Sequence, residues 1–352
     1  MLDINFNQII EMIEKRKNNA YKKVNEEMIL LYLEVGKFLY ELKEKSRYGD
    51  KITTKAADFM ENNYPSIKGF TKRNIERMIQ FYSTYKDDEI ATPLVTQLSW
   101  TNNLLILSGS KTKEERHFYL QLSIKNNYSK RELDRQITSS YYERYMLSDG
   151  KQLPTTNKTI DEDDYPNTRI LDTYSLEFLD LPNEYTEKDL KKAIIKNLKD
   201  FILEVGKDFT FIGDEYRVQV GNHDFFIDLL FYNRELSCLV AFELKLGEFK
   251  AEYLGKMNLY LESLDRDVKK AQENPSVGII LCSSKDKDVV EYSLSKNMSQ
   301  TLISEYKLKL IDKKLLETKL KEMKSLIEND SYGNNNNWWT IYWYSNTKYA
   351  KF

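Results

Sequence analysis

The chain has 352 residues, of which 41% are hydrophobic and 31% charged, and its formal net charge is -2 at pH 7. This length and composition predict two packed domains with heavily charged surfaces. The balanced charge excludes a bulk polycation, so binding of nucleic acid would depend on local basic patches. The only cysteines, Cys238 and Cys282, lie in apolar runs and are predicted to be buried free thiols in a reducing compartment.

Several classes of protein are disfavoured by what the sequence lacks. It has no run of about 18 apolar residues, and its first ten residues lack the basic-then-apolar pattern of a secretion signal. We therefore expect a cytoplasmic protein without a membrane span. The absence of paired cysteines, a glycine-rich phosphate loop and a Ser-His arrangement argues against zinc sites, nucleotide cofactors and serine hydrolases.

Residues 1–148 carry the apolar spacing of amphipathic helices and are predicted to form an all-α domain. Thr71 is suited to cap a helix that runs through Tyr85, and further helices are expected over 113–124 and 129–145. The first helix is expected to present an apolar stripe formed by Ile9, Ile10, Ile13, Met28, Leu31, Tyr32, Val35, Leu39 and Leu42.

Basic and polar side chains gather at the start of the helix that Thr71 caps. They are Lys72, Arg73, Asn74 and Arg77. Contact with the phosphate groups of DNA is chemically reasonable for such a set at a helix start. A solvated helix face is the alternative interpretation.

The second half of the chain has a different pattern. Residues 149–170 are poor in apolar residues and rich in turn formers, which predicts a linker. Helices and strands then alternate over 171–328, which predicts a mixed sheet flanked by helices. Thr186 and Asp189 have the spacing of a capping box, and the helix that they begin is expected to run to about Val205, followed by strands at 210–212 and 216–220. Residues 329–352 form a tail rich in Asn and aromatic residues, interpreted as either a partner-binding segment or a simple extension.

The most informative stretch is a predicted hairpin of strands at 225–232 and 238–245. Its charged residues are Asp228 in the first strand and Glu243 and Lys245 at the end of the second. Glu243 and Lys245 share a face because residues two apart in a strand point the same way. A four-residue turn at 234–237 places Asp228 directly opposite Glu243, whereas a turn of odd length would put them on opposite faces.

Two carboxylates and an ammonium at one edge of a hairpin suit a metal site. Mg²⁺ prefers oxygen ligands, which Asp228, Glu243 and the main-chain carbonyl of Leu244 would supply. Lys245 would position or help to deprotonate an attacking water, or stabilise charge on a phosphate, as phosphodiester hydrolysis requires. The alternative is a structural ion pair in which both carboxylates flank Lys245, because buried charges must be paired.

This Asp…Glu-x-Lys pattern on adjacent strands resembles the PD-(D/E)XK nuclease superfamily. The segments FIGDEYRVQVGNHDFFIDLLFYN, FELKLGEFKAEYLGKMNLYLESLD and NPSVGIILCSSKDKDVVEYSL are similar to the nuclease core of its YhcG-like family. Upstream, KGFTKRNIERMIQFY, QLSW and YSKRELDRQITSSYYER resemble the N-terminal domain that accompanies that core. The resemblance spans about residues 8–325. It implies a restriction-endonuclease-like α/β core behind a helix-turn-helix-like, DNA-binding domain.

The resemblance also implies roles for single residues. Asp228 and Glu243 match the two metal carboxylates, and Lys245 matches the catalytic lysine. Glu204 resembles the glutamate that many superfamily members place on the first core helix, where it contacts the metal through water. A solvated charge at a helix end is the alternative for Glu204.

The sequence departs from the family pattern at three places. Lys256 and Tyr260, one helical turn apart, match a position where some relatives carry Gln and Tyr facing the site, and Lys256 departs from that Gln. Glu215 stands where the family is expected to have Gln. Trp100 is followed by Thr101 and Asn102, where Ser or Thr and then His are expected.

These features together predict a metal-dependent DNA endonuclease that uses Mg²⁺ or Mn²⁺, with the N-terminal domain engaging DNA. The alternative is a catalytically silent protein that keeps the nuclease fold for DNA binding or assembly. Neither interpretation fixes the oligomeric state, and a homo-oligomer is left open.

Overall fold

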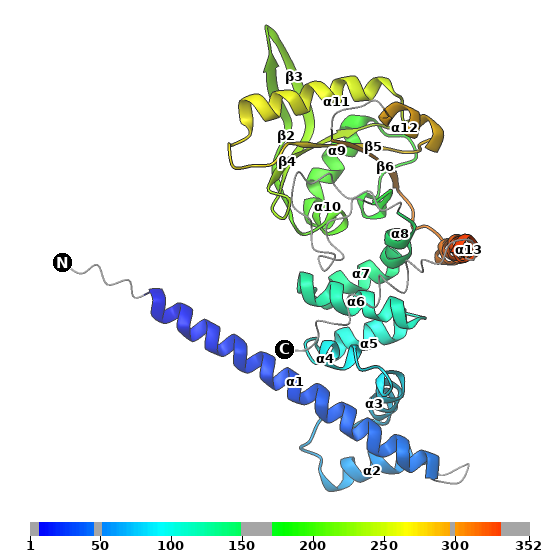
Figure 1. Ribbon diagram of the computed structural model, residues 1–352. Helices are drawn as coiled ribbons and strands as arrows, with labels where there is room; N and C mark the ends of the chain where they lie inside the picture. The colour runs from blue at the N-terminus through cyan, green and yellow to red at the C-terminus, as the bar shows by residue number, and fades with distance from the viewer. Residues whose placement is uncertain (1–6, 46–50, 149–170, 296–299, 332–352) are drawn as a thin grey trace, which may run out of the picture. The chain divides into compact units, whose positions relative to one another are not determined.

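The computed structural model describes residues 7–45, 51–148, 171–295 and 300–331 (Figure 1). The chain divides into two compact units, residues 1–137 and 138–352. The predicted linker at 149–170 and nearly all of the predicted tail lie outside the described residues. Within the described ranges, no helix has the length and apolar character needed to cross a membrane.

The N-terminal unit is all-α, as predicted. Its helices are α1 (Asn7–Lys45), α2 (Ile52–Asn63), α3 (Lys72–Tyr85), α4 (Ala91–Val95), α5 (Trp100–Gly109), α6 (Lys113–Asn126) and α7 (Lys130–Thr138). The Thr71 cap is confirmed, because its side chain accepts a hydrogen bond from the main-chain N–H of Asn74. This cap satisfies one of the free N–H groups at the start of α3.

The single helix predicted over 129–145 is broken in the structure. α7 ends at Thr138, and α8 (Tyr141–Leu147) begins after Ser140, whose φ of 55° lies in the left-handed region. A residue with this backbone conformation cannot continue a right-handed helix. α8 groups with the second compact unit, residues 138–352.

α1 and α3 approach closely at Gly36. A Cβ atom at this position would lie 2.3 Å from the main-chain oxygen of Met78, so only glycine fits. Nearby, Leu39 packs with Ile75 and Ile79 of α3. The absence of a side chain at Gly36 thus sets the distance between the two helices.

The C-terminal unit is a mixed six-stranded sheet with helices, which confirms the predicted α/β class. Its strands are β1 (Thr173–Ser175), β2 (Phe209–Val220), β3 (His223–Asn233), β4 (Cys238–Leu244), β5 (Val277–Cys282) and β6 (Thr301–Lys307), in the order β1-β6-β5-β4-β3-β2. β2, β3 and β4 are antiparallel neighbours, and β4, β5, β6 and β1 pair in parallel. The helices are α8, η1 (Glu177–Leu179), α9 (Glu187–Lys196), α10 (Leu198–Val205), α11 (Glu252–Ser263), η2 (Leu264–Val268), α12 (Lys287–Leu294) and α13 (Lys313–Ser331).

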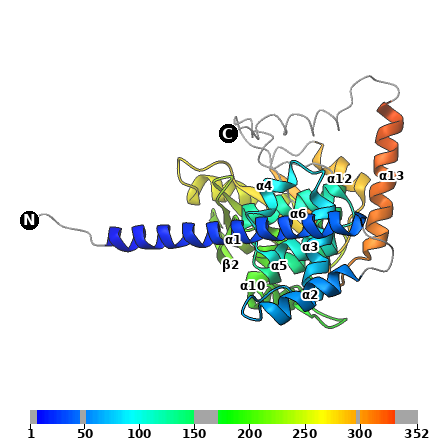
Figure 2. The same ribbon diagram turned by 90° about the horizontal axis from the view of Figure 1, so that it is seen from below.

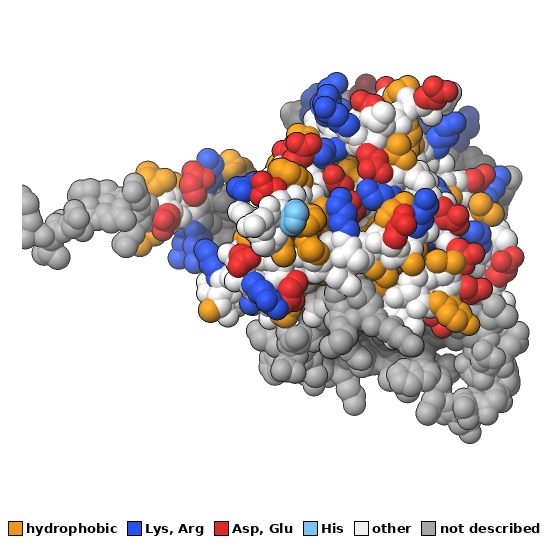
Figure 3. Space-filling view, turned by 90° about the horizontal axis from the view of Figure 1, so that it is seen from above, with side chains coloured by type: hydrophobic (Ala, Val, Ile, Leu, Met, Phe, Trp, Pro, Cys, Tyr) orange, Lys and Arg blue, Asp and Glu red, His pale blue; other side chains and the backbone are white. Residues whose placement is uncertain are grey.

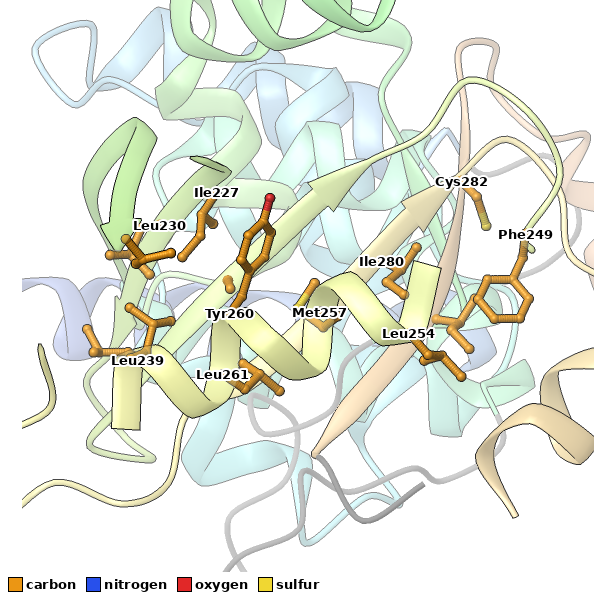
Figure 4. Packing of buried hydrophobic residues seen from close by; sticks show 14 of the residues in the cluster. Ile227, Leu230, Leu239, Phe249, Leu254, Met257, Tyr260, Leu261, Ile280 and Cys282 are labelled. Carbon is orange, nitrogen blue, oxygen red and sulfur yellow. The ribbon is translucent and has the colours of Figure 1, made fainter. Parts of the chain in front are cut away.

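Side-chain alternation in β3 and β4 divides the core between the two faces of the sheet. On one face α11 packs Met257 and Leu261 against residues such as Leu230 and Ile280 (Figure 4). On the other face Phe201 of α10 makes ring contacts with Phe231 and Phe242. β4 is buried along its whole length, as expected for a central strand covered on both faces.

Two predicted boundaries are wrong in detail. The strands expected at 210–212 and 216–220 form the single strand β2, whose pairing with β3 shifts between Phe211 and Gly213. The helix expected to run to Val205 is split at Asn197 into α9 and α10. The capping box at Thr186 and Asp189 is confirmed.

Replacement of Gly36 by Ala should destabilise the N-terminal unit by roughly 1–3 kcal/mol, because the added methyl group overlaps a main-chain oxygen that no rotamer change can move. Denaturant titration of the unit's unfolding transition measures this. Gly255→Ala is the control, since nothing lies within 4 Å of a Cβ at Gly255 in α11. Equal stability of Gly36→Ala and the parent protein would contradict the close approach.

Candidate active site

The β3–β4 hairpin has the predicted geometry. β3 ends at Asn233 and β4 begins at Cys238, which leaves the predicted four-residue turn. Leu229 pairs with Phe242, and one further step of this antiparallel register sets Asp228 opposite Glu243. Directly opposite residues share a face, which here is the face covered by α11.

Glu243 is a buried carboxylate between two lysines. It is 1% exposed, and its Oε1 lies 2.7 Å from Lys256 Nζ and 3.0 Å from Lys245 Nζ. Its Oε2 is buried and has no hydrogen-bond partner. Burial, reinforced by the negative charge of Asp228, raises the pKa of Glu243, and the two lysines act against this rise.

Asp228 is tied to the end of β4. Its Oδ2 accepts a hydrogen bond of 2.9 Å from the main-chain N–H of Leu244, and its Oδ1 lies 3.7 Å from Lys191 Nζ. The side chain is 22% exposed, so solvent reaches the site on the Asp228 side. The hairpin thus presents one buried and one accessible carboxylate at the same edge.

Lys245 lies between two carboxylates. Its Nζ is 3.0 Å from Glu243 Oε1 and 3.2 Å from Oε2 of Glu187, on α9. Burial disfavours the ammonium, but Glu243 and Glu187 outweigh burial and raise the pKa of Lys245. The lysine therefore carries its proton at neutral pH and acts in this arrangement through its positive charge.

α11 contributes Lys256 and Tyr260, one turn apart. Lys256 reaches Glu243, and although burial opposes its charge, Glu243 and Tyr260 raise the pKa of this lysine. The hydroxyl group of Tyr260 donates to the main-chain oxygen of Phe226 in β3. Lys256 therefore joins the charged group directly, whereas Tyr260 links α11 to the strand that carries Asp228.

The sequence did not single out three further residues as parts of this group. Glu187 and Lys191 come from the first turns of α9, and Lys191 Nζ lies 2.8 Å from Glu215 Oε1 as well as near Asp228. Glu215 sits in β2 with a φ of 44°, a left-handed conformation that is unusual for a residue other than glycine. The confirmed cap at Thr186 marked the start of α9, but nothing in the sequence showed that this helix end meets the hairpin.

Glu204 is engaged away from the hairpin. It is 0% exposed, forms an ion pair with Arg144 of α8, and accepts a 2.7 Å hydrogen bond from the main-chain N–H of Ser175 in β1. The interpretation as a solvated helix-end charge is therefore wrong. The break at Asn197 explains the placement, because α9 approaches the hairpin while α10 carries Glu204 to β1.

The residues at the hairpin fit a hard divalent cation that binds protein oxygens and keeps several waters. Glu243 Oε2 offers a buried oxygen without a hydrogen-bond partner, and Asp228 offers a second carboxylate that is 22% exposed. The donors are sparse at the hairpin too: in the described part of the chain, the hairpin included, no three His, Cys, Asp or Glu side chains come together as a group that could hold a metal ion. Any ion would therefore depend on two carboxylates, the Leu244 carbonyl and water.

The predicted DNA-contacting residues at the start of α3 divide into two kinds. Lys72 and Arg73 are exposed, and Arg77 is half-buried. The amide of Asn74 instead donates to the main-chain oxygen of Gly69 and accepts a 2.9 Å hydrogen bond from Trp100 Nε1. Asn74 thus joins α3 to α5 within the N-terminal unit.

Asn102, the second residue after Trp100 and the position where His was expected, lies in the interior of the N-terminal unit. Asn102 is buried, and its side chain donates a 2.9 Å hydrogen bond to the main-chain oxygen of Tyr128. The neighbouring Asn103 donates to the main-chain oxygen of Val95 at 2.8 Å. Both asparagines therefore hold the helices of the N-terminal unit together.

Comparisons with known proteins agree with this division of the chain. Residues 167–321 match the family model of the YhcG PDDEXK nuclease domain, and residues 8–144 match that of the DUF1016 N-terminal domain. The second half of the chain is thus a YhcG PDDEXK nuclease domain. It is 29% identical to the protein of Escherichia coli (strain K12) named "Putative nuclease YhcG", over 91% of this chain and 94% of that protein.

Two solved structures share a more limited likeness with this YhcG-like chain. One is a repair endonuclease from Pyrococcus abyssi, with 19% identity, a TM-score of 0.25 and coverage of 37% of this chain and 50% of that one. The other is described as an EndoMS-dsDNA2 complex, with 16% identity, a TM-score of 0.25 and coverage of 36% and 47%. At these TM-scores the likeness decides neither fold nor substrate.

Replacement of Arg144 by Met should destabilise the C-terminal unit by about 3–5 kcal/mol, because Glu204 would be left as a buried charge without its cation. Denaturant titration of this unit provides the measurement. The control is Arg217→Met, which removes an exposed pair with Asp224 and should change stability little. An equal change in the free energy of unfolding for both substitutions would show that the buried pair contributes no more to stability than the exposed pair.

Proposed function

We propose that this YhcG-like protein is a metal-dependent DNA endonuclease. The observation that carries the proposal is the hairpin edge, where the unpaired Oε2 of buried Glu243 lies on the same face as Asp228 and beside the charged Lys245. The match to a PDDEXK nuclease domain over 167–321 supports the same chemistry. Mg²⁺ or Mn²⁺ is the proposed ion, since both are hard cations that suit carboxylate ligands.

The chain's own residues would divide the work of hydrolysis. A bound divalent ion would supply Lewis-acid activation of the attacking water and of the phosphate. Asp228 and Glu243 would bind that ion from facing strands, and the Leu244 carbonyl would add a third oxygen. Lys245 would stabilise the negative charge that develops on the phosphate, because its raised pKa keeps it protonated.

Residues around the hairpin would hold these groups in position. Glu187 fixes the ammonium of Lys245 from the side opposite Glu243. Lys191 bridges Asp228 and Glu215, which limits the rotamers open to the Asp228 carboxylate. Lys256 balances the buried charge of Glu243 and, being 46% exposed, can also approach a phosphate of the substrate.

Asp228→Asn and Lys245→Met should each lower the rate of DNA cleavage by at least about 100-fold, because each removes a charge used in the transition state. The assay is a panel of duplex, branched and single-stranded DNA with Mg²⁺ or Mn²⁺. Asp224→Asn is the matched control on the same strand, since Asp224 is exposed and pairs with Arg217. Absence of divalent-dependent cleavage of every DNA by the parent protein would refute the catalytic proposal and favour a silent binding protein.

The N-terminal unit would engage DNA through the start of α3. Lys72 and Arg73 are exposed there on the first turn, with Arg77 one turn later. Such contacts would be to phosphate groups and would position DNA without reading its sequence. On the C-terminal unit, Figure 3 shows basic and acidic side chains interspersed on the viewed face, so local basic groups rather than a broad positive surface would attract DNA.

The double substitution Lys72→Ala, Arg73→Ala should weaken DNA binding and reduce the slope of log affinity against log salt by about 2, one for each lost phosphate contact. Fluorescence anisotropy with the catalytically inactive Asp228→Asn protein measures both quantities. Lys51→Ala, Lys125→Ala is the control with the same change of charge, because both lysines are exposed in the same unit. An equal loss of DNA affinity in both double variants would indicate a general effect of net charge instead of a defined contact at the start of α3.

A further inference from the structure

α1 exposes a concentration of apolar side chains. Of the twenty large hydrophobic residues that are exposed in the described chain, ten lie on this helix, with exposures of 42% to 65%. They are Ile9, Ile10, Met12, Ile13, Tyr21, Val24, Met28, Leu31, Phe38 and Leu42. Apolar surface gathered in this way on one element marks an interaction site.

The exposed residues follow a heptad pattern. From Tyr21 the apolar positions alternate at spacings of three and four residues, namely Tyr21, Val24, Met28, Leu31, Val35, Phe38 and Leu42. This is the spacing of the a and d positions in a coiled coil. A second stripe on another face of α1, which includes Ile29, Gly36 and Leu39, is buried within the N-terminal unit. Val35 is partly buried against the cluster that contains Leu39, but the other residues of the heptad stripe are exposed and lie outside the packing of that unit.

The first part of α1 also lacks packing partners among the described residues. Every side chain from Ile9 to Val24 is exposed, and Figures 1 and 2 show this part extending beyond the other helices of its unit. An isolated helix of about 16 residues is marginally stable in water. Stability of this part thus calls for a partner along the apolar stripe.

We propose that two copies of this chain associate through α1, with their exposed stripes paired as an antiparallel coiled coil. The length of the helix favours a second copy as the occupant. α1 has 39 residues, and the next longest helix in the described ranges, α13, has 19. Another α1 matches the stripe in both length and spacing.

The charge of α1 sets the antiparallel direction. Residues 7–24 contain five basic and two acidic side chains, whereas residues 25–45 contain five acidic and three basic ones. An antiparallel pair brings the positive half of each helix over the negative half of the other. A parallel pair would place like halves together, which costs free energy.

One register satisfies both the charge and the heptad pattern. With the helices centred near Glu26, Tyr21 of one copy meets Leu31 of the other, and Val24 meets Met28. The same register brings Ile10 to Leu42 and covers both ends of the stripe. Between them it sets Glu14 opposite Phe38 and Lys17 opposite Val35, so two charged positions interrupt the apolar seam. The seven exposed apolar side chains at these positions, each about half exposed, supply apolar surface on the order of the 800 Å² that each partner buries in a standard interface.

Sedimentation equilibrium of the full chain tests the association. The parent protein should have twice the monomer mass, and Leu31→Gln, Phe38→Gln should weaken the dimer at least tenfold without loss of helix content by circular dichroism. Lys22→Gln, Lys37→Gln is the matched control, because both lysines are exposed on α1 outside the stripe. A monomeric parent protein, or a dimer that survives the Leu31 and Phe38 substitutions, would overturn the proposal.

Disulfide crosslinking tests the direction. Tyr21→Cys mixed with Leu31→Cys should give a crosslinked dimer under mild oxidation, whereas neither variant should crosslink alone. The native Cys238 and Cys282 are buried and should not compete. Crosslinking of Leu31→Cys to itself would overturn the antiparallel arrangement. Dimerisation only after deletion of residues 333–352 would assign the stripe to the chain's own tail and overturn the proposal as well.

Discussion

The candidate site depends on one buried charge. Glu243 sits at the end of a strand covered on both faces, and a carboxylate there is tolerated only because Lys245 and Lys256 approach the same oxygen. The two lysines come from different directions, one from the strand itself and one from α11. Their convergence on Oε1 leaves Oε2 without a hydrogen-bond partner, so the carboxylate is not fully satisfied as an ion pair, and this asymmetry supports the proposed metal site.

The rest of the C-terminal unit is arranged to keep that group assembled. The break at Asn197 turns one predicted helix into two, so that α9 brings Glu187 and Lys191 to the hairpin while α10 packs Phe201 against the opposite face of the sheet. The pair formed by Arg144 and Glu204 then joins α8 to α10 behind the sheet. The one break at Asn197 thus allows α9 to contribute to the charged group at the hairpin and α10 to pack in the core.

Features governed by local rules could be predicted from the sequence, and those governed by tertiary contacts could not. Side-chain parity and the four-residue turn were enough to set Asp228 opposite Glu243, and the capping residues gave the starts of α3 and α9. The part played by Glu187 could not be predicted, because it depends on where the start of α9 lies relative to β4. The surroundings of Glu204 could not be predicted for the same reason. Its residue type and its place on a helix were evident from the sequence, but its partners depend on the helix break at Asn197 and on Arg144, sixty residues earlier in the sequence.

Lysine at position 256 changes the character of the hairpin edge. The ammonium of Lys256 already neutralises part of the charge of Glu243 before any other cation arrives. Under the proposed function, binding of a metal ion here would be an exchange, in which the ammonium of Lys256 gives way to the metal ion. With nearly half of its side chain in solvent, Lys256 has room to withdraw, so the protein carries its own removable counterion.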